Sequence, residues 1–221
     1  MSSKKIVVAM DGPAGAGKST VARLVAEALE LKLLDTGAMY RCVALACSRA
    51  GLGVADVDDV VALCETLNID FGSHGEVLMN GSDVSTDIRL PEMSDLASAL
   101  SAIPGVRRIL GAQQQAFIEA GGYVLEGRDT TSVIAPNAEV KVYLTASIEE
   151  RAERRFKELK ARGMEVPLED LAKQIAERDA RDMNRADSPL KRVPDALAIE
   201  TYGMTPQQVA QKIVDHARTL I

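Results

Sequence analysis

The run Gly12-Pro13-Ala14-Gly15-Ala16-Gly17-Lys18-Ser19-Thr20 fits the pattern G-x-x-x-x-G-K-[ST], the phosphate-binding loop, at every fixed position. Its glycines permit backbone conformations in which successive N–H groups point at a polyphosphate. Lys18 adds an ammonium group near the outer phosphates, and the Ser19 hydroxyl is a ligand for Mg²⁺. The run therefore predicts a site for a nucleoside triphosphate with Mg²⁺, with residues 12–20 around the triphosphate.

The sequence on either side of this run has the pattern that the motif requires. Residues 6–10 are apolar throughout, as in a strand buried on both faces. After the run, apolar residues repeat at helical spacing, at Val21, Leu24, Val25, Ala28 and Leu29. A glycine-rich turn that binds nothing is the alternative. Such a turn needs one or two glycines and no Lys-Ser pair, so the binding site is the favoured interpretation.

The bulk composition limits the class of protein. A chain of 221 residues can build one domain with an insertion, or two small domains. A net charge of −6 argues against nucleic acid as a partner, because nucleic-acid binding usually leaves a basic footprint. The three cysteines, Cys42, Cys47 and Cys64, lack the paired spacing of a disulfide framework or a zinc site. We expect a cytoplasmic protein with no signal peptide and no membrane association.

Further apolar strand patterns alternate with helical patterns along the chain. They fall at about 31–34, 123–126, 140–144 and 196–200. Together with residues 6–10 they predict an α/β fold with a doubly wound, parallel, five-stranded sheet. Ligands bind beyond the carboxyl ends of the strands in such sheets. We therefore expect four segments to converge: the phosphate loop, residues 35–37, residues 127–129 and the arginine-bearing helices.

Two segments depart from this alternation. Between residues 68 and 89 apolar and polar residues alternate around Asn80-Gly81, a strong hairpin signal, which predicts a small antiparallel sheet; a flexible loop is the alternative. Residues 35–37 read as a polar loop before a helix over 39–50. Asp56 and Ser147 are predicted to be the N-cap residues of two further helices.

A cluster of arginines marks the C-terminal half of the chain. Arg178, Arg181 and Arg185 fall at i, i+3 and i+7, on one face of a predicted helix. A solvated helix with i, i+4 ion pairs is the alternative. The breaks at Gly163 and Pro167, between this helix and an earlier arginine-rich one, favour a hinged lid that excludes water when it closes.

The class of phosphate-loop protein follows from the remaining residues. GTPase switches need an N-K-x-D run, which is absent, and motor-type ATPases have a strand that ends in an acidic metal-binding residue and a much larger body. A small kinase fits better, because its phosphoryl acceptor needs an anion site and the transferring group must be clamped. Candidate arginines outside the loop are Arg41, Arg128, Arg178, Arg181 and Arg185.

Four runs resemble the signature runs of bacterial cytidylate kinases, which are P-loop nucleoside monophosphate kinases: Asp11–Ser19, Leu34–Arg41, Glu126–Asp129 and Arg178–Arg185. The resemblance spans nearly the whole chain. It implies a P-loop kinase fold with helices on the parallel sheet, a small antiparallel β insert that binds the monophosphate, and a short helical lid. It implies transfer of the ATP γ-phosphoryl group to CMP or dCMP, with Mg²⁺. Thr36 replaces a common serine, and Thr130-Thr131 replace a common Met-Gly pair.

The resemblance also implies a role for each matching residue. Lys18, Arg128, Arg178 and Arg185 form the catalytic set, and Ser19 is the metal ligand. Arg41, Arg128 and Arg178 are assigned to the acceptor phosphate, Ser98, Arg107 and Asp129 to the cytosine, and Asp182 to the sugar; Thr36 completes the substrate-binding set.

Donor and acceptor chemistry agrees with the base assignments. A carboxylate at Asp129 suits the cytosine amine, and the Arg107 guanidinium with the Ser98 hydroxyl suits the two acceptors beside it. Plain structural roles are the alternatives: a surface carboxylate paired with an arginine for Asp129, a helix position for Ser98, and surface arginines for Arg107 and Arg41.

The sequence thus predicts a monomeric kinase for CMP and dCMP. Its core spans about 1–67, 105–150 and 188–221, the monophosphate-binding insert about 68–104, and the lid about 151–187. Alternatives are a broader UMP/CMP kinase, another small P-loop kinase, and a nucleotide-switched binding protein.

Overall fold

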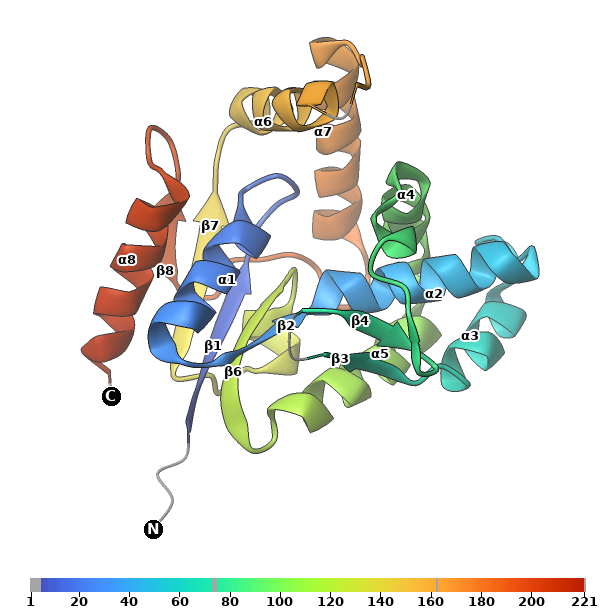
Figure 1. The fold of residues 1–221 in the computed structure, drawn as a ribbon, viewed down its shortest axis with the longest axis horizontal. Coiled ribbons are helices and arrows are strands. Elements are labelled where there is room, and N and C mark those ends of the chain that lie inside the picture. The colour runs from blue at the N-terminus through green and yellow to red at the C-terminus, as the bar shows by residue number, and fades with distance from the viewer. Residues whose placement is uncertain (1–4, 73–74, 162, 221) are drawn as a thin grey trace. The chain divides into compact units, whose positions relative to one another are not determined.

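The computed structural model describes residues 5–72, 75–161 and 163–220 (Figure 1). The chain packs as two compact units, Met1–Leu33 with Ala120–Ile221 and Leu34–Glu119. This division concerns packing alone, and the boundaries of the core, the monophosphate-binding insert and the lid stay predictions. None of the described helices is long and apolar enough to cross a membrane.

A five-stranded sheet runs through the first unit and takes in the start of the second. Its order is β2-β6-β1-β7-β8, and its strands are β1 (Lys5–Asp11), β2 (Lys32–Asp35), β6 (Gly121–Gly127), β7 (Val140–Thr145) and β8 (Leu197–Glu200). β1 pairs in parallel with both β6 and β7, so that Met10 lies opposite Glu126 on one side and Val142 on the other. The predicted parallel, doubly wound sheet is confirmed. The segments that follow β1, β6 and β7 all leave from one edge of the sheet.

The core of the first unit lies between this sheet and two helices, α1 (Lys18–Leu29) and α8 (Pro206–Arg218). Both helices are amphipathic, and they pack side by side on the sheet (Figure 1). Val21 and Val25 of α1 and Ile213 of α8 are almost fully buried against Val8 and Leu144. α1 begins directly at the end of the phosphate loop, so this packing holds the loop against the sheet.

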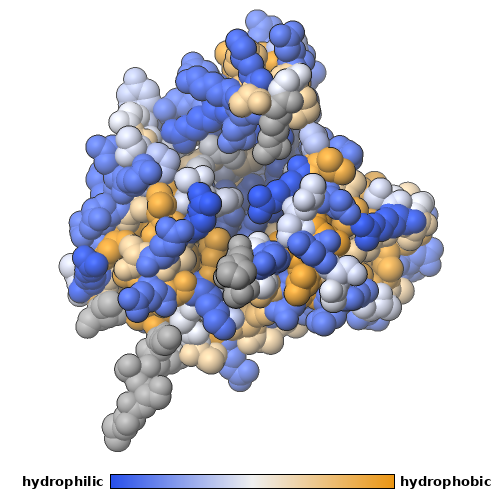
Figure 2. All heavy atoms as spheres, in the orientation of Figure 1, coloured by the Kyte–Doolittle hydropathy of each residue, from blue (hydrophilic) through white to orange (hydrophobic). Residues whose placement is uncertain are grey.

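Two further helices of the first unit, α6 (Ile148–Ala161) and α7 (Leu168–Asn184), pack against each other around a small apolar cluster of their own. Leu159, Leu171 and Ile175 are its buried members. The predicted cap at the start of α6 is confirmed, because Ser147 Oγ accepts a hydrogen bond of 3.2 Å from the Glu150 N–H. The visible surface over α6 is mainly hydrophilic (Figure 2). The helix pair is therefore built with its own core.

The second unit is mainly helical. Its helices are α2 (Thr36–Ala50), α3 (Val57–Glu65), η1 (Asp87–Arg89), α4 (Pro91–Leu100) and α5 (Pro104–Ile118). α2 packs against α4, and α3 against α5. Strands β3 (Ile69–Phe71), β4 (Val77–Met79) and β5 (Ser82–Asp83) form a three-stranded antiparallel sheet. Asn80 and Gly81 have φ of 51° and 80°, as a tight hairpin turn requires. The predicted antiparallel sheet is confirmed, and the flexible-loop alternative is wrong.

One local prediction is wrong. Residues 35–37 do not form a loop before a helix at 39, because α2 already begins at Thr36. Asp35 is its N-cap and accepts a hydrogen bond of 2.8 Å from the Ala38 N–H. Asp56 is the N-cap residue of α3, as predicted, although its carboxylate accepts a hydrogen bond from the Gly53 N–H at 2.8 Å and makes no capping bond to the helix.

Candidate active site

The phosphate loop, residues 12–17, joins β1 to α1 as the motif requires. Gly12 has a φ of 154°, and a Cβ there would lie 2.1 Å from the carbonyl oxygen of Leu144 on β7. Only glycine fits this close approach. The Lys18 side chain turns back over the loop, and its Nζ donates to the carbonyl oxygens of Gly12 at 2.8 Å and Pro13 at 2.9 Å.

Lys18 is held in a strongly perturbed electrostatic environment. It is 5% exposed. Burial lowers the pKa of Lys18 to about 7; Arg128 and Arg178 add to this effect, whereas Glu126 and Asp11 oppose it. The carbonyl bonds orient the ammonium group but bring no full negative charge. A polyphosphate beside Lys18 would supply that charge and favour the protonated form of the lysine.

The Ser19 hydroxyl donates to the carboxylate of Glu126, which lies near the carboxyl end of β6. Hydroxyl and carboxylate oxygens are the ligands that Mg²⁺ takes from proteins, so this pair fits the metal. Among the described residues no group of three or more His, Cys, Asp or Glu could hold a metal ion. Most ligands to Mg²⁺ would then come from phosphate and water, as is usual in phosphoryl transfer.

Sequence reasoning missed this role of Glu126. The available signal was an acidic residue at the end of a strand, the feature that was used to set motor-type ATPases apart. Glu126 lies near the end of a strand in this protein too, so an acidic residue at a strand end does not separate small kinases from motor-type ATPases.

A buried charge cluster lies just after β6. Arg128 Nε donates to Asp182 Oδ2 at 2.8 Å, Arg185 Nη1 lies 3.7 Å from Asp182 Oδ1, and Arg185 Nη2 lies 4.0 Å from Asp129 Oδ1. Burial acts to raise the pKa of Asp182, but Arg128, Arg178 and Arg185 together outweigh it and hold that pKa below its usual value. The predicted residues Arg128, Asp129, Arg178, Asp182 and Arg185 are thus brought together.

The predicted single arginine face of α7 is only partly right. α7 ends at Asn184, so Arg185 lies beyond it as the C-cap residue, where its Nε donates to the carbonyl of Ser188 at 2.7 Å. Arg181 is exposed, whereas Arg178 is half-buried and acts on the pKa of Asp182. Arg178 therefore reaches the charge cluster from within α7, whereas Arg185 reaches it from the residue that follows the helix.

A second buried ion pair, Arg151–Asp179, is hydrogen-bonded to the phosphate loop. Arg151 Nη1 donates to Asp179 Oδ2 at 2.6 Å and to the carbonyl oxygen of Ala14 at 2.9 Å. Asp179 Oδ1 accepts from the Ala14 N–H at 3.2 Å. Both polar groups of the Ala14 residue are thus bound by one residue of α6 and one of α7. The sequence contained no local signal for this pair, because Asp179 lies 165 positions from Ala14.

The second unit carries the other predicted substrate-binding residues: Thr36, Arg41, Ser98 and Arg107. Arg41 Nη2 pairs with Asp35 at 2.9 Å. Arg107 is 6% exposed; its guanidinium lies 5.5 Å from the Tyr40 ring, and its Nη1 donates to the Ser101 carbonyl at 3.3 Å. Thr36 is buried in the first turn of α2.

Ser98 has an unsatisfied polar group. Its side chain is 6% exposed, and its Oγ has no hydrogen-bond partner among the described residues. The Ser98 carbonyl accepts from Ser101 Oγ at 2.8 Å, which links Ser98 to the residue that Arg107 contacts. A buried hydroxyl without a partner is unfavourable in the isolated protein and favours a ligand contact.

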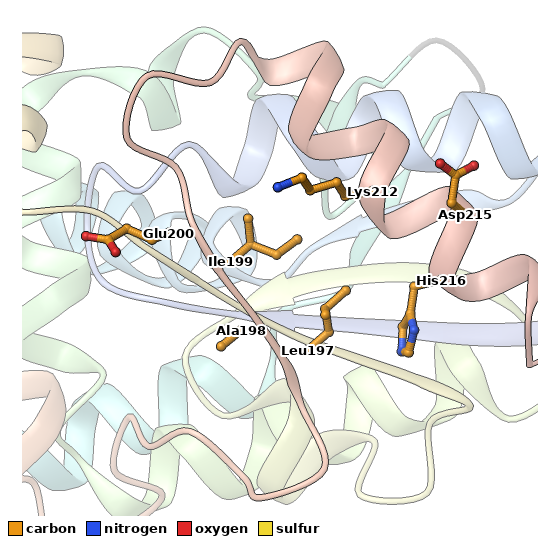
Figure 3. A pocket seen from close by; sticks show the side chains of 7 residues that line it. All are labelled: Leu197, Ala198, Ile199, Glu200, Lys212, Asp215 and His216. Atoms are coloured by element: carbon orange, nitrogen blue, oxygen red, sulfur yellow. The ribbon is translucent and has the colours of Figure 1, made fainter.

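A hollow of about 410 Å³ lies elsewhere in the first unit, on the edge strand β8 (Figure 3). Side chains from β8 and from one face of α8 line it: Leu197, Ala198, Ile199, Glu200, Lys212, Asp215 and His216. It contains no residue of the phosphate loop or of the charge cluster. The hollow therefore does not mark the active site, which is defined by charged groups at the carboxyl ends of β1 and β6.

The parallel sheet, the phosphate loop with its buried lysine, and the adjoining arginine cluster define the class of P-loop kinases. The model of the cytidylate kinase family matches residues 8–219 of this chain. A cytidylate kinase of Syntrophotalea carbinolica is 45% identical over 215 residues, which cover 96% of this chain and 92% of that protein. One of Shewanella sediminis is 44% identical over 224 residues, which cover 99% and 97%. The chain therefore belongs to the cytidylate kinase family, and it phosphorylates CMP and dCMP with ATP.

Solved structures support the fold alone. Shikimate kinase from Acinetobacter baumannii has a TM-score of 0.50 at 18% identity and covers 97% of this chain and 94% of that one. An uncharacterized protein from Eubacterium ventriosum has a TM-score of 0.54 at 11% identity, with coverage of 98% and 99%.

Proposed function

We propose that the active site has three parts: a donor site for ATP, a site for the acceptor phosphate and a site for the base. The donor site is the phosphate loop, residues 12–20, with Lys18 on the outer phosphates of ATP. The Ser19 hydroxyl would hold Mg²⁺, with Glu126 orienting that hydroxyl, and the bound metal would supply positive charge for phosphoryl transfer. This proposal is supported by the perturbed pKa of Lys18 and by the Ser19–Glu126 contact.

Arginines hold the acceptor phosphate in this proposal. As the family resemblance implies, Arg41, Arg128 and Arg178 bind it, and Arg185 stabilises the transferring group. The observation that carries the proposal is the charge cluster, in which Arg128, Arg178 and Arg185 gather around the carboxylate of Asp182. Three guanidinium groups close together suit a dianionic acceptor.

Asp129, Ser98 and Arg107 read the cytosine, and Asp182 binds the sugar. The Ser98 hydroxyl without a partner supports this part of the proposal, because a cytosine acceptor would satisfy it. Asp182 has a second role, because its 2.8 Å bond to Arg128 orients the guanidinium that binds phosphate. Thr36 adds a hydroxyl to the substrate-binding set.

The helix pair α6–α7 serves as a lid, and the protein acts as a monomer in the cytoplasm. The apolar cluster between α6 and α7 lets this helix pair move as one body. Three buried, free cysteines, Cys42, Cys47 and Cys64, are consistent with a reducing compartment.

The Asp129→Asn substitution tests the base site. A uracil oxygen opposite Asp129 leaves two acceptors facing each other, which costs roughly 1–3 kcal/mol, so the native enzyme should prefer CMP over UMP more than about tenfold. Asparagine keeps the shape but can present a donor or an acceptor. It should lower kcat/KM for CMP and narrow the CMP-to-UMP ratio. Equal losses for both substrates would mean that Asp129 positions Arg128 and does not read the base.

A further inference from the structure

Asp11, the last residue of β1, is bound on both of its carboxylate oxygens by two consecutive threonines. Oδ1 accepts from the Thr130 N–H and the Thr130 hydroxyl, both at 2.8 Å. Oδ2 accepts from the Thr131 N–H at 2.8 Å and from the Thr131 hydroxyl at 2.6 Å. One carboxylate therefore receives four hydrogen bonds from a single two-residue turn.

These bonds form in the interior of the first unit. Asp11 and Thr130 are fully buried, and Thr131 is 1% exposed. Burial raises the pKa of Asp11, and the four threonine donors act against that rise. A buried carboxylate without such donors is unfavourable, so each threonine hydroxyl contributes to keeping this contact in place.

The bound turn directly follows the residues that contact the acceptor. Arg128 and Asp129 come immediately before Thr130, between strand β6 and the π-helical turn η2 (Thr130–Ile134). On the other side, Asp11 comes immediately before the first glycine of the phosphate loop and lies opposite Gly127 in the sheet. The carboxylate thus joins the start of the donor loop to the end of the acceptor loop.

We propose that Asp11 is a positioning residue for CMP, which fixes the Arg128–Asp129 backbone through the four bonds to Thr130 and Thr131. The inference rests on the proposed roles of Arg128 and Asp129 in binding the acceptor. Beyond those roles, Asp11 of β1 and the hydroxyls of Thr130 and Thr131 place the Arg128 and Asp129 side chains without touching the substrate.

A graded set of threonine variants separates this role from a general loss of stability. Thr131→Val keeps the shape of the side chain and removes one donor to Asp11, and Thr130→Val does the same on the other oxygen. Thr131→Ser keeps the hydroxyl and is the matched control. Asp11→Asn turns an amide N–H₂ group towards the two donors of one threonine. Its effect on KM for CMP should therefore be larger than that of either threonine variant, but this substitution could also impair folding. The threonine variants keep the test decisive in that case.

We expect Thr131→Val to raise KM for CMP about three- to tenfold, the effect of one lost hydrogen bond, with kcat and KM for ATP within about twofold of the native values. Thr131→Ser should retain native KM for CMP. Amide hydrogen exchange of residues 127–134, measured without nucleotides, should be faster in Thr131→Val than in Thr131→Ser.

Two results overturn the inference. Equal KM for CMP in Thr131→Val and Thr131→Ser would show that the hydroxyl does not position the acceptor loop. An equal rise in KM for CMP and for ATP would assign the four bonds to the phosphate loop. Asp129→Asn, measured alongside, tests the proposed function separately: an unchanged CMP-to-UMP ratio in that variant refutes base reading by Asp129. Even if base reading by Asp129 is refuted, the KM for CMP of the threonine variants shows whether Asp11 acts through the loop that carries Arg128.

Discussion

Removing one member of the Arg151–Asp179 pair should destabilise the protein far more than removing both. Arg151 is 4% and Asp179 is 6% exposed, and their charged atoms lie 2.6 Å apart. Asp179→Leu leaves the Arg151 guanidinium buried without its counter-charge, which costs about 3–5 kcal/mol. For a chain of this size, that cost corresponds to a fall in the unfolding midpoint of roughly 6–20 °C. Arg151→Met should have a similar effect.

The double variant Arg151→Met/Asp179→Leu replaces the pair with apolar side chains of similar size. Such a replacement is often close to neutral for stability, so its midpoint should lie above that of either single variant. Thermal and denaturant unfolding of the four proteins gives the comparison. If each single substitution changes the free energy of unfolding by less than about 1 kcal/mol, or if the double variant is as unstable as the sum of the two, the reasoning about a buried, mutually dependent pair is wrong.

The same four proteins separate stability from function. Arg151 and Asp179 bind the carbonyl and the N–H of Ala14, and the double variant removes both contacts. Its stability should recover, but its KM for ATP should stay raised about three- to tenfold, because the phosphate loop has lost two of its bonds. Native KM for ATP in the double variant would show that the pair does not organise the loop.

Three other predictions follow from the site. Lys18→Met should lower turnover by several orders of magnitude while CMP still binds in calorimetry; near-native turnover would refute the donor-site assignment. With its folded pKa lowered from 10.5 to about 7, Lys18 holds fewer protons in the folded than in the unfolded chain between those pH values. The free energy of unfolding of the native protein, minus that of Lys18→Met, should therefore rise from pH 7 to 9, and a flat difference would contradict the lowered pKa. Hydrogen exchange over residues 151–185 should slow when an ATP analogue and CMP are both bound, and unchanged exchange would argue against a lid.

The fold could be predicted from the sequence because its signals are local. The phosphate loop with its flanking strand and helix, the apolar strands and the Asn80-Gly81 turn each lie within a few residues. The start of α2 could also be predicted from the sequence, because Asp35 lies three residues before the Ala38 N–H that it caps. We predicted a polar loop over residues 35–37 instead. The helix-cap rule would have given the right start.

The contacts that organise the site could not be predicted in this way. Asp11 and Thr130 are 119 positions apart, Ser19 and Glu126 are 107 apart, and Arg128 and Asp182 are 54 apart. No periodicity in the sequence joins residues at such separations, and only the tertiary packing of strands and helices brings them together. The family resemblance predicted which residues belong to the site, whereas the tertiary fold determines which of them touch.

The acidic residues of the site have a common effect on its arginines. Asp182 binds Arg128, Asp35 binds Arg41, and Asp129 Oδ1 lies 4.0 Å from Arg185 Nη2. In the proposed acceptor site each guanidinium would thereby be held in place for a phosphate, which would reduce the entropy lost on binding. The same aspartates cancel part of the positive charge, so these arginines would hold a phosphate group less tightly than unpaired arginines would. A kinase needs both properties, because the product that it must release carries one more phosphate than the acceptor that it binds.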